Sequence, residues 1–526
     1  MRESKTTWRQ LLMLVSLAVG LVLGARVMPA QDGPGMEFPF KDRQTVLFFG
    51  DSIVAPGMYS YVVNSLLDRV HPGHGLTFSS WGQAGATAES ILPRVPEVLK
   101  GKTYDWVLLN FAHNDCCRYS ADEFLSTHAP SLLAEVRKYH KGRIGWLSIL
   151  GSEPSPYAGK PNRVKADACI AETRAKQGQY AEAVKALCHE QGLLYVPLHE
   201  AMSRLLAERE RQNLKICFTM DHVHPNLLGN WIVGGLLLQA MGLDPAPLTV
   251  DVLQSDAYTA QGSRDVTPPA QPQMLDFAGL FLKVRLIPPA ERVVTADPVA
   301  APVVVDGAPS EWPPDLKAYR IAPPLNVTWE LVPRSSTAGY AATLRACHNA
   351  QMLYLLFDVT EPNTGQGKWF DELIEVLIDA RKDRSRSGNV WRHTPGLTQF
   401  LFSRDFTGGV PGNAKAWANG DTSQGDGLKA AARRTEHGYV LEAAIPLANF
   451  KQVDITKTDG APLDWALSFT DQTFNLDWQG LMSRSGSTFG YGTLRLGGPG
   501  AAVVFTDPGS TVTLAGTNAA AVRRTP

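Results

Sequence analysis

The sequence lacks an excess of charge of either sign. Its 526 residues carry 50 basic and 51 acidic side chains, for a formal net charge of −1, and the charges are spread along the chain. Nucleic acid binding relies on clustered Lys and Arg side chains that neutralise phosphates, so a nucleic acid partner is not expected. With 44% hydrophobic residues the composition is that of a folded globular protein. A chain of this length is expected to form two or more domains.

The N-terminal apolar run is too short for a membrane span, which takes about 20 residues. This run, Leu11–Gly24, follows the basic residues Arg2, Lys5 and Arg9. The layout predicts a secretory signal peptide at residues 1–30. An uncleaved N-terminal membrane anchor is the alternative, because the end of the segment is a poor match to a cleavage site. Either way the rest of the chain is expected to be secreted or to reside in the periplasm or cell envelope.

Paired Cys-x-x-Cys spacings are absent from the sequence, so a cysteine-based zinc site is not expected. Six cysteines in an exported chain permit disulfides, but their spacing fixes no pairing. Five fall in the first half of the chain and one in the second: Cys116, Cys117, Cys169, Cys188, Cys217 and Cys347.

Short apolar runs alternate with longer amphipathic stretches between residues 44 and 241. The runs are Thr45–Phe49, Leu76–Ser79, Trp106–Asn110, Ile144–Leu150 and Leu193–Val196. Helical periodicity marks Tyr59–Val70, Ala88–Leu99, Ala121–Tyr139, Val164–Glu190 and Leu227–Met241. This alternation predicts an α/β three-layer sandwich at residues 40–245, with a parallel sheet covered on both faces. Catalytic residues of such a fold belong at the carboxyl ends of the strands.

The pattern changes twice in the rest of the chain. Residues 246–300 are rich in Pro, Ala, Gln and Thr around one strand-like run, Phe281–Ile287, which indicates a linker with some local structure. At 301–498 short apolar runs of period two are punctuated by Gly, Pro, Asn and Asp, which predicts an all-β sandwich. Residues 499–526 have little apolar content and are expected to be a loosely ordered tail.

Two short motifs at opposite ends of the α/β region offer the groups of a serine nucleophile. Ser52 follows the first predicted strand in Gly50-Asp51-Ser52-Ile53, at a turn that presents its hydroxyl at the sheet edge. Asp221 and His224 stand in Asp-His-Val-His-Pro-Asn, just before the last predicted helix. An acid three residues before a histidine is able to hold the tautomer of its imidazole.

Metal binding is the competing interpretation of the second motif. Asp221, His222 and His224 are all possible ligands, and His113 offers a fourth. We expect no catalytic metal, because such a site would still need further ligands and an open coordination position.

Two further segments match the needs of an oxyanion hole, which binds the negative oxygen of the transition state. Asn114 follows the strand Trp106–Asn110 and supplies a side-chain amide. Gly85 lies in the Gly-rich turn WGQAGAT, whose backbone N–H groups are able to point at a developing charge. Gly82 of the same turn is the alternative, and the choice of Gly85 depends on its spacing to Thr87.

Taken together and in this order, these motifs resemble the SGNH (GDSL-type) hydrolase family over about residues 44–242. The resemblance implies a flavodoxin-like fold, with Ser52, Asp221 and His224 as the catalytic triad. It also implies an oxyanion hole formed by Ser52, Gly85 and Asn114. The sequence departs from the family at Ala112, where a glycine is usual, and at Ser80, where an asparagine often stands.

The second half resembles family 9 carbohydrate-binding-type modules over about residues 301–498. The motifs include VVVDG at 303–307 followed by Glu311-Trp312, LYLLFDVTE at 353–361 and FGYGTLRL at 489–496. Sugar binding needs exposed aromatic faces, for which the candidates are Trp369, Trp391, Trp417 and Trp478. The resemblance also makes structural Ca²⁺ in this module an expectation.

An exported esterase joined to a carbohydrate-binding-like module predicts a carbohydrate O-acetylesterase that needs no cofactor for catalysis and has no stable protein partner. Its expected substrate is an acylated, most simply acetylated, carbohydrate. A lipase or lysophospholipase on the same scaffold is one alternative. The other is a catalytically inactive carbohydrate-binding protein at the cell surface. The complete set of motif residues argues against this last alternative.

Overall fold

The computed structural model describes most of the chain between residues 37 and 497. The segments within this span that are left out are 157–163, 255–256, 259–267, 290–291, 324, 331–338, 363–372, 383–389, 391–392, 405–413, 453–454, 456–459, 470–473 and 480–490. The predicted signal peptide and tail lie outside the described residues. Among the described helices, none has both the length and the apolar composition needed to span a membrane.

A sheet of five parallel strands forms the centre of the first domain, in the order β2-β1-β3-β4-β5. The strands are β1 (Thr45–Gly50), β2 (Thr77–Gly82), β3 (Trp106–Asn110), β4 (Arg143–Leu147) and β5 (Leu194–Val196). This order is that of flavodoxin-like doubly wound folds, and it confirms the predicted fold class. The winding reverses between β1 and β3, so the carboxyl ends of these two strands border the crevice where such folds bind ligands.

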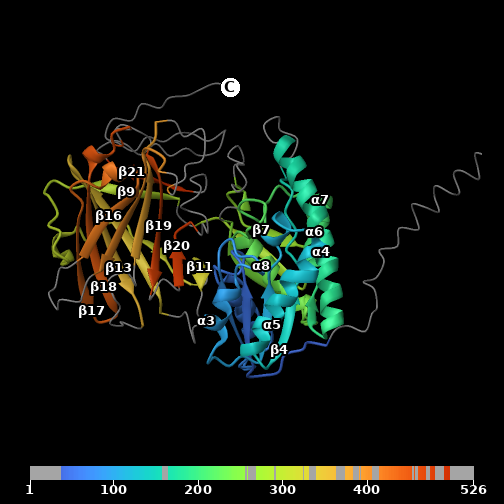
Figure 1. The fold of residues 1–526 in the computed structure, drawn as a ribbon. Coiled ribbons are helices and arrows are strands. Elements are labelled where there is room, and N and C mark those ends of the chain that lie inside the picture. Colours follow the sequence, from blue (N-terminus) through green and yellow to red (C-terminus); the bar gives the residue numbers. More distant parts are fainter. Residues whose placement is uncertain are drawn as a thin grey trace, which may run out of the picture.

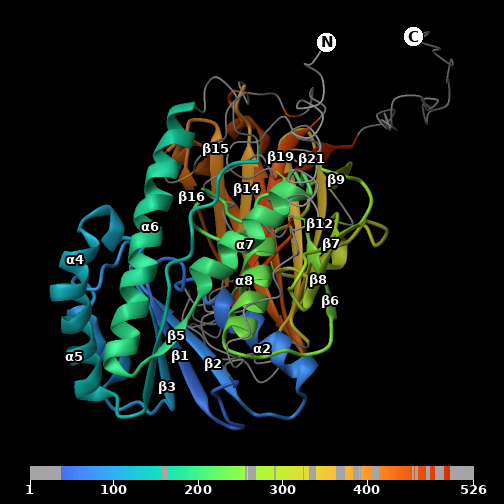
Figure 2. The ribbon, with the colours of Figure 1, turned by 90° about the vertical axis from the view of Figure 1, so that its right-hand side faces the viewer.

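Helices cover both faces of this sheet, because its strands are apolar on both sides. Along β1, Val46 and Phe48 belong to one apolar cluster, and Leu47 and Phe49 belong to the other. Figure 2 shows α7 and α8 on one side of the sheet and α5 and α6 on the other. The helices are α2 (Met58–Val70), α3 (Val95–Leu99), α4 (Ala121–Glu123), α5 (Ala129–Tyr139), α6 (Val164–Gln191), α7 (Leu198–Arg211) and α8 (Leu227–Ala240).

Two helical segments differ from the sequence prediction, and a third, α6, packs partly in the core. The predicted helix Ala88–Leu99 is reduced to a 3₁₀ turn, Leu92–Arg94, and the short α3, both of which have proline near the start. The helix α7 was not predicted, although Leu198, Met202 and Leu206 are buried at helical spacing. Tyr180, Val184 and Leu187 of α6 belong to the core, so this half of the helix is part of the packed domain.

The segment predicted as a linker is more ordered than its composition indicates. The strands β6 (Leu248–Leu253), β7 (Gln273–Asp276) and β8 (Leu282–Ile287) form a three-stranded sheet. This sheet packs on α8, where a side chain at Gly235 would come within 3.1 Å of Leu282. The next strand, β9 (Val293–Pro298), already belongs to the second domain, because it pairs with β21 and β12. The linker prediction is corrected accordingly.

The second domain consists of β strands arranged in two layers, as predicted. One layer runs β16-β15-β14-β19-β21, the other runs β12-β13-β18-β17, and β9 connects them. Phe357 of β13 and Trp465 of β19 meet between the layers, with ring centroids 5.7 Å apart. The strands are β10 (Tyr319–Ile321), β11 (Val327–Glu330), β12 (Ala341–His348), β13 (Met352–Thr360), β14 (Leu373–Asp379), β15 (Leu397–Arg404), β16 (Ala414–Gly420), β17 (Lys429–Thr435), β18 (Gly438–Pro446), β19 (Ala461–Phe469), β20 (Phe474–Asp477) and β21 (Gly492–Leu496).

The two domains lie side by side and are in direct contact (Figure 1). One apolar cluster runs without a break from α2 and α8 through the β6–β8 sheet into the β sandwich. Strand β11 of the second domain contacts α2, the helix that follows the Ser52 turn. The sandwich is therefore a packed part of the molecule rather than a module on a free tether.

Candidate active site

Ser52 lies at the carboxyl end of β1, on a turn that the neighbouring backbone forces to be tight. A side chain at Gly50 would lie 2.7 Å from the carbonyl oxygen of Asn110 on β3, so only glycine fits there. The Asp51 carboxylate accepts a hydrogen bond from the N–H of Ile53 at 3.0 Å, and its carbonyl accepts one from Val54. The turn leaves the Ser52 side chain partly exposed at the sheet edge.

Asp221 and His224 lie on a loop that leads into α8. Asn226 caps this helix by accepting a hydrogen bond from Gly229 N–H at 2.8 Å. One carboxylate oxygen of Asp221 accepts from the N–H groups of Val223 and His224 at 3.2 and 2.9 Å. Its other oxygen is thereby directed at the imidazole of His224 and lies 2.8 Å from Nδ1.

These three residues meet although 172 positions separate Ser52 from His224. His224 Nε2 lies 2.8 Å from Ser52 Oγ, and its other ring nitrogen is held by Asp221. The geometry allows a proton to pass from the serine hydroxyl to the imidazole, with a carboxylate on the far side of the ring.

The charges of the Asp221–His224 pair are set by their mutual contact. The hydrogen bond that the His224 ring donates to Asp221 raises the pKa of His224 above its usual value. Loss of hydration raises the pKa of Asp221, but the bonds from His224 and Val223 outweigh it and hold that pKa at about 2. Asp221 is therefore ionised at neutral pH and favours the imidazolium form of His224.

The candidate oxyanion donors lie at the ends of the neighbouring strands. Gly85 has a φ of 73° and space around its Cα, whereas a side chain at Gly82 would collide with Ala55 N at 2.5 Å. Gly82 is thus explained by close backbone packing. In the part of the chain that the structure describes, the N–H groups of Ser52 and Gly85 donate to no protein acceptor. The Asn114 amide donates to Ala86 O at 3.0 Å.

Ala112 and His113, which precede Asn114, are both unusual. Ala112 has a φ of 131°, a region that suits glycine, and such strain costs about 1–3 kcal/mol. The backbone at Ala112 thus takes a conformation that glycine adopts more readily than alanine. Burial lowers the pKa of His113 to about 3, so this imidazole is neutral.

The position of His222 gives little support to metal binding by Asp221, His222 and His224. Its Nδ1 lies 2.9 Å from Glu153 O, which engages one of its two possible ligand atoms. Among the described residues, the one group of three neighbouring candidate ligands is in the second domain: Asp306, Glu311 and Glu442.

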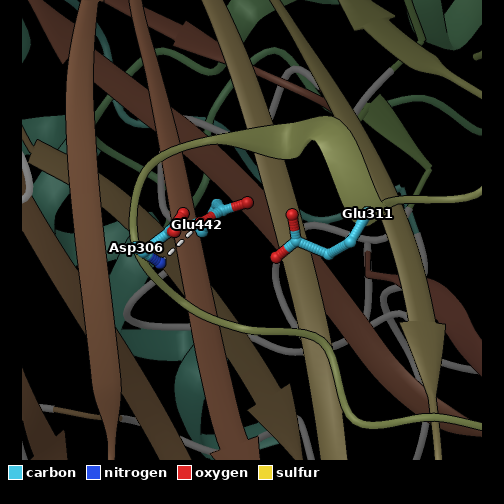
Figure 3. A group of neighbouring side chains, drawn as sticks. All are labelled: Asp306, Glu311 and Glu442. Carbon is cyan, nitrogen blue, oxygen red and sulfur yellow. Dashed lines mark hydrogen bonds between the residues drawn. The ribbon is translucent and has the colours of Figure 1, made fainter.

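This acidic group, shown in Figure 3, is already explained in part by hydrogen bonds. Glu442 Oε2 accepts from the N–H groups of Asp306 and Gly307 at 2.9 and 2.7 Å. Its Oε1 accepts from Trp312 Nε1 at 2.7 Å. The buried glutamate thus anchors the VVVDG…EW segment. Both oxygens of Glu442 thus already accept hydrogen bonds from the protein. Calcium binding in this module stays a prediction.

Of the four tryptophans predicted to bind sugar, the structure places one in the core. Trp478 is 4% exposed and meets Tyr319 edge to face. It therefore presents no face for stacking, and that prediction is corrected. Trp369 and Trp391 lie outside the described residues, as does the side chain of Trp417, which stands on β16.

Comparisons with known proteins agree with this architecture. Residues 48–232 match the GDSL-like Lipase/Acylhydrolase family, and residues 317–483 match the Carbohydrate family 9 binding domain-like family. The chain is thus a carboxylic ester hydrolase with a GDSL-like acylhydrolase domain followed by a carbohydrate-binding-like domain, in the predicted order.

An acetylxylan esterase of Geobacillus stearothermophilus is 25% identical over 230 residues, which cover 38% of this chain and 95% of that protein. The crystal structure of Axe2, an acetylxylan esterase from Geobacillus stearothermophilus, matches with 22% identity and a TM-score of 0.31, over 39% of this chain and 96% of that one. LAE5, an alpha/beta hydrolase from the metagenome of Lake Arreo, Spain, matches with 19% identity and a TM-score of 0.31, over 39% of this chain and 97% of its own.

Proposed function

We propose that this chain is an exported serine O-acetylesterase that acts on acetylated carbohydrate, with Ser52, His224 and Asp221 as its catalytic triad. The observation that carries the proposal is the unbroken set of contacts from Ser52 Oγ through His224 to Asp221, with both distances at 2.8 Å. A hydroxyl, a base and an orienting carboxylate in this order are the parts of an acyl-transfer site.

The reaction proceeds in two halves. Ser52 Oγ attacks the ester carbonyl while His224 takes its proton, and His224 then protonates the departing alcohol. Water, deprotonated by His224, attacks the acyl-serine and releases the acid. The N–H groups of Ser52 and Gly85 and the Asn114 amide hold the oxyanion that forms in each half. These steps call for no metal or organic cofactor.

Replacing Asn114 by alanine is expected to lower kcat by about 10²–10³-fold with little change in KM, because one oxyanion donor is lost. Steady-state hydrolysis of p-nitrophenyl acetate measures this effect. Thermal melting serves as the control, since the amide also donates to Ala86 O. A kcat within threefold of the wild-type value in a folded variant would remove Asn114 from the oxyanion hole.

Two observations support an acetylated carbohydrate as the substrate. The similar protein from Geobacillus stearothermophilus is an acetylxylan esterase, and a carbohydrate-binding-like domain follows the hydrolase domain here. Direct packing of that domain against the hydrolase domain would hold a bound polymer near the active site and raise its effective concentration.

The substrate class is tested by measuring acetate release from acetylated xylan, pectin and chitin oligomers beside hydrolysis of p-nitrophenyl esters of increasing acyl length. Acetyl esters of one of the oligomers are expected to be the best substrates. Activity that rises with acyl length would instead identify a lipase or lysophospholipase. Because the two domains share one apolar cluster, sugar binding is better tested in the full chain than by truncation. Trp369→Ala, Trp391→Ala and Trp417→Ala variants, assayed for retardation in polysaccharide gels, serve for this.

A further inference from the structure

The Asp221–His224 pair is not held in place by burial of its own side chains. The Asp221 side chain is 57% exposed and that of His224 is 33% exposed. The loop carrying them is narrow: Met220 N–H donates to His224 O at 2.7 Å, and Thr219 pairs with Pro225. Contacts between this loop and other parts of the domain must therefore keep the two side chains aligned with Ser52.

A buried carboxylate supplies that support on the side where the loop begins. Glu153, which follows β4, is 0% exposed. It accepts hydrogen bonds from Phe218 N–H at 3.0 Å, from Thr219 N–H at 2.8 Å and from the Thr219 hydroxyl at 2.6 Å. The carboxylate thus holds the two residues that stand two and three positions before Asp221.

The backbone of the same residue holds the other side of Asp221. Glu153 N–H donates to His222 O at 2.8 Å, and Glu153 O lies 2.9 Å from His222 Nδ1. His222 has a φ of 80°, which is unfavourable for histidine and therefore depends on such contacts. Asp221 lies between the two points at which residue 153 binds the loop.

Arg209 of α7 completes the arrangement by neutralising the buried glutamate. Its guanidinium is paired with the Glu153 carboxylate and is itself 1% exposed. It also donates to Pro154 O at 3.0 Å and Ile216 O at 3.3 Å, on the two segments that the ion pair joins. The groups that contact the Glu153 carboxylate in these hydrogen bonds are all donors, as an ionised group requires. Burial raises the pKa of this carboxyl, and the charge of Arg209 together with these donated hydrogen bonds opposes that rise.

We propose that Glu153 is a positioning residue for catalysis: held ionised by Arg209, it fixes the loop on both sides of Asp221 and so keeps the Asp221–His224 pair aligned with Ser52. This inference rests on the proposed triad. A buried ion pair of this kind adds little stability by itself, but removing one partner leaves an unpaired charge in the interior. A displacement of about 1 Å at a catalytic group lowers the rate by about 10²-fold.

The main test uses the double variant Glu153→Gln/Arg209→Met in the full chain. Arg209→Met removes the charge that Glu153→Gln alone would leave buried without a partner. Glutamine keeps one acceptor oxygen, so the Phe218 N–H, which lies 3.0 Å from both carboxylate oxygens, faces an NH₂ group at one of the two positions. We expect kcat to fall about 10²-fold with KM unchanged. The acidic limb of the kcat/KM profile is expected to move to lower pH, because a displaced Asp221 carboxylate raises the pKa of His224 less.

A second variant leaves the ion pair intact. Thr219→Val removes one hydroxyl donor to Glu153 and is expected to lower kcat severalfold, with the same direction of shift in the pH profile.

The matched control for the double variant is Asp379→Asn, which breaks another buried ion pair, that of Asp379 with Arg381 in the second domain. This control is expected to lower the melting temperature while the pH profile for a small ester stays in place.

The outcomes separate this inference from the proposed function. Folded Glu153→Gln/Arg209→Met protein with a wild-type kcat and pH profile would overturn the positioning role. If the double variant does not fold, Thr219→Val decides, and an unchanged kcat and profile there overturns the role as well. If Ser52→Ala retains hydrolysis, the proposed triad is wrong, whatever the Glu153 variants show.

Discussion

Replacing Ser52 by alanine is expected to lower kcat for p-nitrophenyl acetate by about 10⁶-fold, with the protein fully folded. Ser52 Oγ lies 2.8 Å from His224 Nε2 and is the atom that forms the acyl bond in the proposed mechanism. Without it, only oxyanion stabilisation and substrate binding remain, and these give residual rates well below those of an intact triad. The substitution removes one oxygen from a partly exposed side chain, so the effect on stability is expected to be small.

Ser65→Ala is the matched control for this experiment. Ser65 is a partly exposed serine on α2 whose hydroxyl donates to Tyr61 O at 2.8 Å. It lies in the same domain, so both variants report on the same fold. We expect Ser65→Ala to keep wild-type kcat. Turnover by Ser52→Ala within tenfold of the wild-type rate would mean that another group forms the acyl bond, and the proposed mechanism would then be wrong.

The sequence predicted the candidate site best where its residues stand in short motifs next to a predicted strand or helix. Ser52, Asn114 and the Asp221–His224 pair could each be placed relative to a strand or helix from the local pattern alone. Their meeting could not be measured from the sequence, because the 2.8 Å contact joins residues 172 positions apart. Packing of α8 against α2 supplies it, because α8 follows the loop that carries His224 and α2 follows the turn that carries Ser52.

Features that depend on contacts between residues far apart in the chain could not be predicted, for the same reason. Glu153 and Arg209 are charged residues in unremarkable local sequence, and only the fold reveals that both are buried and paired. Trp478 was predicted to be an exposed stacking surface, yet a side chain at Gly492 would come within 2.6 Å of its ring. The strands β6 and β7 were hidden by the Pro-rich composition around them, and their order comes from packing with α8 and β8 rather than from local propensity.

Asp221→Asn is expected to lower kcat by about 10⁴-fold, mainly through the tautomer of His224. The Asp221 oxygen near Nδ1 accepts a hydrogen bond from the ring N–H, which keeps the proton on Nδ1 and leaves Nε2 free to accept the proton of Ser52. An asparagine that keeps its oxygen for the N–H groups of Val223 and His224 turns its NH₂ group toward Nδ1. The ring must then carry its proton on Nε2, where it cannot act as a base toward Ser52.

The pH dependence gives this variant a second, independent measurement. The rate of the wild-type enzyme is expected to fall as the pH drops through the pKa of His224, because the protonated imidazole cannot accept the serine proton. The hydrogen bond that His224 donates to Asp221 raises that pKa, so the acidic limb of the wild-type kcat/KM profile is expected above the usual histidine value of about 6.5. Removing the carboxylate lowers the pKa, so the limb of Asp221→Asn is expected to lie at lower pH.

Asp122→Asn, at an exposed aspartate in the first turn of α4, is the matched control and is expected to change neither kcat nor the profile. A loss of rate in Asp221→Asn without a shift of the limb would mean that the carboxylate orients the ring but does not set its pKa. A shift of the limb toward higher pH would contradict the contact between Asp221 and His224 on which the proposed mechanism depends. The direction of the shift therefore tests the electrostatic half of the triad, while the size of the rate loss tests its geometry.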